Sequence, residues 1–320
     1  MGNDSFQTSI VPIVRDFHPM ADLQLARNKK VVKQIELSVC KSKSRPVLTG
    51  VFQMQNKCGG ALGIQSNLEK MLKIIALAGQ NGIQILAFPE MCLQGYFTPE
   101  SGSAAEAFEE NARLAIDPEN SKEISRLCKA AARANLVIIF GFAEKSKSGI
   151  FNSAGVIDAD GRWLGLRRKN PLYPYDHETL SFATLKRSKR SSVFQTKIGR
   201  IGVSICFDGE FAESVRHMRI GGAELLVWIN AALGDSILGT SQRSNTSGAY
   251  AHGNGIWVMC VNCVAPDSSG MSCIYSLEGE PLIILSSNRE ELGIAKIDLS
   301  MDTLWRDIWN SRIEKKIDFQ

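Results

Sequence analysis

The feature that most constrains the fold of this chain is a repeated alternation of short apolar runs with longer amphipathic segments. Apolar runs of strand length lie at residues 45–54, 82–90, 135–144 and 223–230. Strands joined through helical crossovers lie parallel and are buried on both faces, so they contain few polar residues. The pattern therefore predicts an α/β domain rather than separate all-α and all-β units.

The first amphipathic segment predicts a helix with one buried face. Leu68, Met71, Leu72 and Ile75 recur at positions i, i+3, i+4 and i+7. Asn67 stands directly before this stripe, and asparagine is a common N-cap, so we expect the helix to begin there. Other expected elements are a helix around 124–131, a hairpin of 151–158 with 162–169, helices at 210–221 and 240–254, and strands at 197–206, 255–264, 272–277, 281–285 and 292–298.

The two ends of the chain differ from this central pattern. Residues 1–46 are polar and basic and predict an N-terminal extension with one helix and a Ser/Lys-rich linker. Residues 47–300 form the expected domain. Residues 301–320 predict a C-terminal tail helix, since two tryptophans four residues apart lie on one helix face.

Charge and hydropathy point away from two classes of partner. The net charge is +4 over 320 residues, and the basic cluster 185–190 is typical of a solvated loop. No apolar run reaches the ~18 residues of a membrane span. The N-terminus lacks the basic start and apolar core of a secretory signal. We therefore expect a cytoplasmic protein that binds neither nucleic acid nor membrane.

The eight cysteines are scattered, which favours reduced thiols over a disulfide framework. Cys260 and Cys263 form a lone CxxC motif in a strand-like run, where this spacing directs two side chains to opposite faces. Together with Cys273 they leave a zinc protein as a minor alternative, because neither a second pair nor a suitably spaced histidine accompanies them.

Three chemically reactive residues follow predicted strands. Glu90, Lys169 and Cys206 each stand at the carboxyl end of an apolar run, where ligands collect in open α/β sheets. A thiol with a free pKa of about 8.5 needs a base or a cationic neighbour to react at neutral pH. A carboxylate can remove its proton, and an ammonium group can stabilise charge on an attacked carbonyl oxygen. The three side chains together predict a cysteine nucleophile.

Three ordered blocks carry a resemblance to a known family. The blocks are FPEMCLQGY (88–96), RRKNPLYPYDHE (167–178) and GVSICFDGEFAESVRHMRIGGAELLV (202–227). They resemble the signature blocks of the nitrilase, or carbon–nitrogen hydrolase, superfamily. The resemblance implies a four-layer α-β-β-α sandwich.

The same resemblance implies roles for individual residues. Glu90 would be the general base, Lys169 the transition-state stabiliser and Cys206 the nucleophile, with Glu178 in the place of an additional family glutamate. It further implies a homodimer or larger homo-oligomer, with no metal and no organic cofactor.

The residues after the cysteine are similar to those of one branch of the family. Nitrilases typically follow the nucleophile with Trp-Glu, whereas residues 207–209 here are Phe-Asp-Gly, as in amidases and N-carbamoyl amidohydrolases. The resemblance thus implies hydrolysis of a small linear amide or N-carbamoyl compound through a thioester at Cys206. Pro171 and Gly253 depart from the family pattern, so an inactive binding or scaffold protein with the same fold is the alternative.

Overall fold

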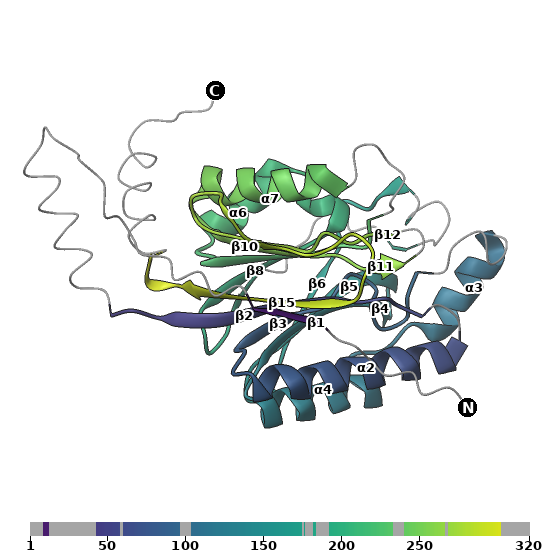
Figure 1. The fold of residues 1–320 in the computed structure, drawn as a ribbon. Coiled ribbons are helices and arrows are strands. Elements are labelled where there is room, and N and C mark those ends of the chain that lie inside the picture. Colours follow the sequence, from purple (N-terminus) through teal and green to yellow (C-terminus); the bar gives the residue numbers. More distant parts are fainter. Residues whose placement is uncertain are drawn as a thin grey trace, which may run out of the picture.

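Two β-sheets packed face to face form the centre of the structure, and helices cover the outer face of each (Figure 1). This arrangement is the α-β-β-α sandwich expected from the sequence. The computed structural model describes residues 9–12, 43–57, 60–96, 104–174, 176, 182–183, 192–232, 240–265 and 268–301.

The first sheet has the strand order β1-β15-β2-β3-β4-β5-β6. Its central strands β2, β3 and β4 are parallel, while β15, β5 and β6 pair antiparallel beside them. The strands are β1 (Ser9–Pro12), β2 (Pro46–Gln53), β3 (Ile85–Ala87), β4 (Val137–Ser146), β5 (Gly149–Ile157), β6 (Trp163–Arg168) and β15 (Glu291–Asp298).

The second sheet has the order β14-β13-β10-β9-β8-β7, with β8, β9 and β10 parallel at its centre. Its strands are β7 (Val193–Gln195), β8 (Arg200–Ile205), β9 (Leu225–Ile229), β10 (Trp257–Val261), β13 (Cys273–Tyr275) and β14 (Pro281–Ile284). A separate ribbon consists of β11 (Val264–Ala265) and β12 (Ser268–Ser269).

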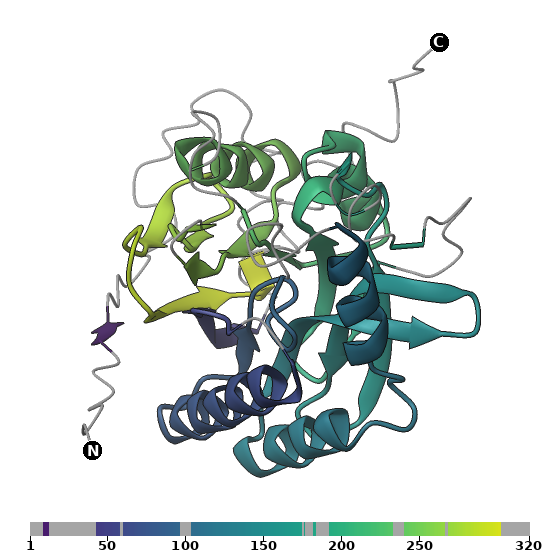
Figure 2. The ribbon, with the colours of Figure 1, turned by 90° about the vertical axis from the view of Figure 1, so that its right-hand side faces the viewer.

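Among the described elements, two helices cover the outer face of each sheet. Helices α2 (Gly60–Gln80) and α4 (Lys122–Ala134) lie on the first sheet, and α6 (Ala212–Ile220) and α7 (Thr240–Asn254) lie on the second (Figure 1). Helix α3 (Ala104–Leu114) stands at one end of the sandwich (Figure 2). The predicted hairpin of β5 and β6 and the predicted helices α4 and α7 are confirmed.

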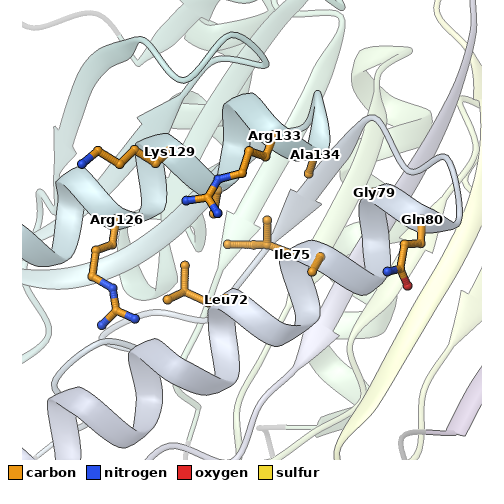
Figure 3. Close-up of a pocket in the computed structure, with 10 residues that line it drawn as sticks. Leu72, Ile75, Gly79, Gln80, Arg126, Lys129, Arg133 and Ala134 are labelled. Carbon is orange, nitrogen blue, oxygen red and sulfur yellow. The ribbon is translucent and has the colours of Figure 1, made fainter.

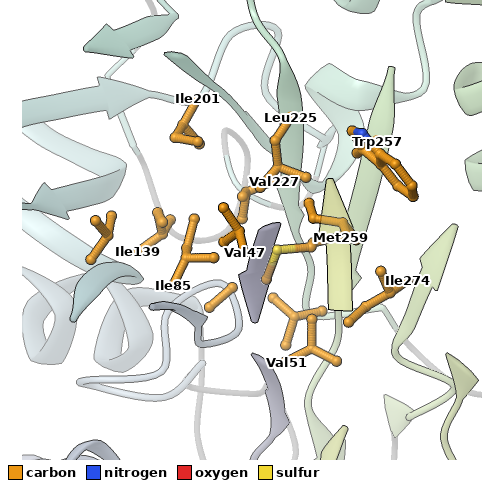
Figure 4. Packing of buried hydrophobic residues seen from close by; sticks show 14 of the residues in the cluster. Val47, Val51, Ile85, Ile139, Ile201, Leu225, Val227, Trp257, Met259 and Ile274 are labelled. Carbon is orange, nitrogen blue, oxygen red and sulfur yellow. The ribbon is translucent and has the colours of Figure 1, made fainter. Parts of the chain in front are cut away.

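The space between the sheets is filled by aliphatic side chains from both. Val47 and Ile85 of the first sheet meet Val227 and Met259 of the second in one continuous cluster (Figure 4). These strands are covered on both faces, which explains why their sequences are apolar at nearly every position.

The predicted start of the first helix is wrong. Helix α2 begins at Gly60, so Asn67 lies inside it and is fully buried. Its amide accepts from the Lys57 nitrogen at 2.9 Å and donates to the Lys57 oxygen at 2.8 Å and to the Leu93 oxygen at 3.1 Å. The asparagine therefore joins α2 to two loops and does not cap the helix.

The ends of the chain are described only in part. Strand β1 lies within the predicted extension 1–46 and pairs parallel with β15 at the sheet edge. The predicted helix of the extension and nearly all of the predicted tail helix 301–320 lie outside the described residues, so these domain boundaries stay predictions. Within the described part of the chain, no helix is both long and apolar enough to cross a membrane.

Candidate active site

Glu90 lies three residues beyond β3, in a turn pressed against β4. Met91, the next residue, adopts a left-handed backbone with φ 51°. The backbone of Gly141 in β4 packs directly against this turn. A Cβ added at Gly141 would stand 2.5 Å from the Glu90 Cα, closer than any real contact. The missing side chain at position 141 therefore lets the Glu90 turn sit directly on the sheet.

The Glu90 carboxylate is fully buried, and both of its oxygens accept hydrogen bonds. Its Oε2 accepts from the backbone nitrogen of Ala231 at 2.9 Å. Its Oε1 accepts from the Tyr96 hydroxyl at 2.7 Å, the Asn152 amide at 2.8 Å and the Lys169 ammonium at 2.8 Å. These contacts fix the orientation of the carboxylate and satisfy the buried charge.

Lys169 follows β6 and points its ammonium group into the same cluster. Its backbone nitrogen extends the ladder by donating to the Asn152 oxygen at 2.8 Å. The Nζ atom, on a residue only 2% exposed, lies 2.8 Å from Glu90 Oε1 and 2.6 Å from Asp176 Oδ2. One lysine thus bridges two buried carboxyl groups.

Asp176 is a site residue that the sequence reasoning missed. Besides Lys169, it accepts from the Tyr173 nitrogen at 3.2 Å, and its Oδ1 lies 3.0 Å from the Tyr96 hydroxyl oxygen. The available signal was an acid seven residues after the lysine in the same sequence block. Glu178, which the resemblance selected instead, lies outside the described residues, so its role stays a prediction.

Tyr96 and Asn152 were also missed. Both contact Glu90, and the Asn152 amide donates to the Tyr96 hydroxyl at 2.8 Å. Tyr96 belongs to the first signature block, but Asn152 lies in the middle of β5 and had no sequence motif to mark it.

Burial and opposite charges set the protonation states of this cluster. Burial by itself would raise the pKa of Glu90, but the Lys169 ammonium and three hydrogen bonds hold it below its usual value. Burial would lower the pKa of Lys169, yet the charges of Cys206, Glu90 and Asp176 raise it above its usual value. Burial raises the pKa of Asp176, and Lys169 only partly opposes this. At neutral pH the Glu90–Lys169 pair is therefore ionised.

Cys206 stands on a sharp turn directly after β8. Strand β8 ends at Ile205, and the one-turn 3-10 helix η2 (Cys206–Gly209) begins at the cysteine itself. Cys206 has φ 46°, a left-handed conformation that non-glycine residues rarely adopt. Such outliers persist only where their surroundings hold them, and they cluster at functional sites.

The indole of Trp228 on β9 is one of the groups that hold this turn. Its Nε1 donates to the Cys206 oxygen at 2.9 Å. Gly209 makes room for the ring, since a Cβ there would lie 2.6 Å from the Trp228 Cε2. Cys206 is also an electrostatic neighbour of the buried cluster. Burial lowers the pKa of Lys169 and raises that of Tyr96, and the negative charge of a Cys206 thiolate raises both.

The cysteines of the zinc alternative lie elsewhere. Cys260 and Cys273 face each other across β10 and β13 beneath α7, while the Cys263 sulfur lies 3.0 Å from the Ser268 hydroxyl. Among the described residues, no three His, Cys, Asp or Glu side chains are grouped so that they could hold a metal ion.

A groove on the outer surface lies away from this site. It has a volume of about 570 Å³ and runs between α2 and α4, with Leu72 and Ile75 on one side and Arg126, Lys129 and Arg133 on the other (Figure 3). Neither Glu90 nor Lys169 nor Cys206 lines it. The chemistry of the buried cluster, not the size of this groove, identifies the candidate active site.

Known proteins share both the sequence pattern and the fold. An N-carbamoylputrescine amidase of Arabidopsis thaliana is 31% identical over 168 residues, 52% of this chain and 54% of that protein. The chain thus matches about half the length of that relative. A probable nitrilase of Schizosaccharomyces pombe is 29% identical over 249 residues, 74% of this chain and 84% of that protein.

The same fold has been solved crystallographically. A carbon-nitrogen hydrolase from Helicobacter pylori superposes with a TM-score of 0.69 and 24% sequence identity, covering 86% of this chain and 97% of that one. The family model described as carbon-nitrogen hydrolase matches residues 48–307. This match covers most of the chain and spans Glu90, Lys169 and Cys206. The chain belongs to the carbon-nitrogen hydrolase family.

Proposed function

We propose that this protein is a cysteine-dependent amidohydrolase that acts on a small linear amide or N-carbamoyl compound. One observation carries the proposal: a fully buried Glu90–Lys169 ion pair, 2.8 Å between Oε1 and Nζ, with the Cys206 turn as its electrostatic neighbour. A buried ion pair contributes little to stability on balance, so a site that retains one beside a strained cysteine fits a reactive role.

In the first half of the reaction Cys206 attacks the substrate carbonyl carbon. The Glu90 carboxylate takes the thiol proton, and the carbonyl oxygen gains negative charge as the new C–S bond forms. The buried Lys169 ammonium stabilises this charge. When the C–N bond breaks, Glu90 returns the proton to the leaving ammonia or amine, and a thioester remains on Cys206.

In the second half water replaces the amine. Glu90 removes a proton from the water as it attacks the thioester carbonyl carbon, and Lys169 again stabilises the oxyanion. The C–S bond breaks, the thiol regains its proton, and an acid or carbamate leaves. The lowered pKa of Glu90 and the raised pKa of Lys169 keep both groups in the charge states that these steps need.

The substrate class rests on the residues after the nucleophile and on the relatives. Phe207, Asp208 and Gly209 resemble the amidase branch, and relatives include an N-carbamoylputrescine amidase and a citrullinase of Francisella tularensis. The loops expected to set specificity, near 95–105, 170–190 and 232–240, fall largely outside the described residues.

The test is release of ammonia from a panel of linear amides and N-carbamoyl amines by the purified protein. Wild type should hydrolyse at least one member, and Cys206→Ala should lose this activity. Mass spectrometry after substrate addition should find the acyl adduct on Cys206. Hydrolysis that survives the substitution would contradict the mechanism, and an inert wild type with an unreactive Cys206 would favour the scaffold alternative.

A further inference from the structure

A second buried ion pair connects the two segments that carry Lys169 and Cys206. Arg167 precedes the lysine by two residues, and Asp208 follows the cysteine by two. The Arg167 Nη2 and Asp208 Oδ2 atoms lie 3.2 Å apart, and the side chains are 7% and 0% exposed. The pair therefore joins the end of β6 in the first sheet to the turn after β8 in the second.

Asp208 binds the backbone of both segments, the one that follows β6 and the one at the end of β8. Its Oδ1 accepts from the Ile205 nitrogen at 2.6 Å and from the Ser204 hydroxyl, which fixes the start of the cysteine turn. Its Oδ2 also accepts from the backbone nitrogen of Asn170, the residue directly after the lysine, at 3.4 Å. Arg167 reaches the Asn170 oxygen at 3.5 Å.

These contacts connect the segment that carries Lys169 to the segment that carries Cys206. The path runs from Lys169 through the Asn170 peptide to Asp208, and from Asp208 through the turn to Cys206. The charge of Arg167 also matters, because an unpaired carboxylate two residues from the cysteine would oppose a thiolate. Burial raises the pKa of Asp208, and Arg167 is the main group that opposes this rise.

We propose that Arg167, through Asp208, is a positioning residue that fixes the Cys206 turn against Lys169 and neutralises the carboxylate beside the thiol. This assignment rests on the proposed function only where it is tested by kcat and KM. The alkylation test of Cys206 needs no substrate. Stability alone is a weak reason for such a pair, since buried ion pairs are often replaceable by apolar residues without loss.

The neighbouring residue offers a matched control. Arg168 lies on the same strand with its side chain on the opposite face, and it forms an ion pair with Glu144 at 2.6 Å, with side chains 12% and 4% exposed. It stacks on Phe151 at 3.7 Å from the ring centroid. This pair is also largely buried, but the contacts described for Arg168 lie within β4, β5 and β6 and do not include the cysteine turn.

The experiment compares Arg167→Met, Arg167→Lys and Arg168→Met with wild type by alkylation with iodoacetamide across pH 6–9. Peptide mass spectrometry follows Cys206 and, in the same digest, the fully buried Cys92, which reports unfolding. The titratable groups described above are unchanged in all variants: Glu90, Tyr96, Lys169, Asp176 and Asp208.

We expect Arg167→Met to slow Cys206 alkylation at pH 7 about tenfold. A rise of about one unit in the pKa of the Cys206 thiol would lower the reactive thiolate fraction by this factor. Arg167→Lys keeps the cation but not the forked donor, so its rate should fall between those of Arg167→Met and wild type. Arg168→Met should label Cys206 at the wild-type rate. An unchanged rate in Arg167→Met, or an equal loss in Arg168→Met, overturns the proposal.

Two further outcomes are distinguishable. If Arg167→Met labels at Cys92 and is therefore unfolded, Arg167→Lys decides, and a wild-type rate in that variant overturns the proposal. On an active substrate, Arg167→Met should lower kcat about tenfold or more with KM little changed. If wild type hydrolyses nothing while Cys206 alkylation still depends on Arg167, the proposed function fails and the positioning role stands.

Discussion

Lys169 and Asp176 are seven residues apart in the chain, and their Nζ and Oδ2 atoms lie 2.6 Å apart in a site that also contains Glu90. One ammonium group is thus shared by two carboxyl groups, and the Tyr96 hydroxyl lies within hydrogen-bonding distance of both. Asp176 therefore helps to decide where the lysine ammonium stands.

Asp176→Asn should lower kcat by about tenfold to a hundredfold, because Lys169 loses a charge-assisted bond and its ammonium is free to move toward Glu90. KM should change less. Steady-state ammonia release from an amide that the wild type hydrolyses measures both kcat and KM. Asp176→Glu should recover part of the loss, and equal activity in wild type and Asp176→Asn would show that the lysine needs only Glu90.

Gly141→Ala should reduce stability by about 2 kcal/mol or more and displace the Glu90 turn, because backbone atoms of Glu90 and Met91 occupy the place of the new Cβ. Denaturant unfolding measures the first effect and ammonia release the second. Gly253→Ala is the matched control. Nothing lies within 4 Å of a Cβ there, and the position is in α7, so stability should hold or rise by ~0.5–1 kcal/mol.

Asn67→Leu should destabilise the protein by about 2–3 kcal/mol, because it leaves the Lys57 nitrogen and the Leu93 oxygen without their partner inside the structure. Thermal or denaturant unfolding tests this. Asn135 provides a contrast, since it ends α4 in a left-handed conformation with φ 50°. Asn135→Gly should cost little, and equal losses in both variants would show that Asn67 is no special tie.

The stability gained from Glu90 should depend on pH in one direction. Its pKa is lower in the folded protein than in the unfolded chain, so the ionised carboxylate stabilises the fold above the unfolded value of about 4.3. That contribution is lost as the pH falls through the folded value. The difference in unfolding free energy between wild type and Glu90→Gln should therefore shrink from pH 7 to pH 3. A constant difference would contradict the lowered pKa.

The sequence predicted those features that depend on repeated patterns. The alternation of apolar runs with helical stripes identified the layers, and three residues at strand ends pointed to the site. The features that it missed depend on contacts between distant segments. Asn67 resembled a helix cap because a buried amide that joins two loops has the same local sequence as a cap.

The missed site residues have the same explanation. Asn152 contacts Glu90 across 62 positions of sequence, and nothing near it in the chain marks a polar residue in a buried strand as functional. Asp176 was overlooked in favour of Glu178. The sequence alone does not say how the loop after Lys169 is folded, and therefore does not say which acid contacts the lysine.

The candidate site takes its residues from both sheets. Glu90 and Lys169 extend from β3 and β6 of the first sheet, whereas Cys206 extends from β8 of the second. The separation between Glu90 and Cys206 therefore depends on how the two sheets pack across the aliphatic layer around Val47, Ile85 and Val227. A change of one methylene group in that layer, far from any substrate, would therefore alter the geometry of the site as well as the stability of the fold.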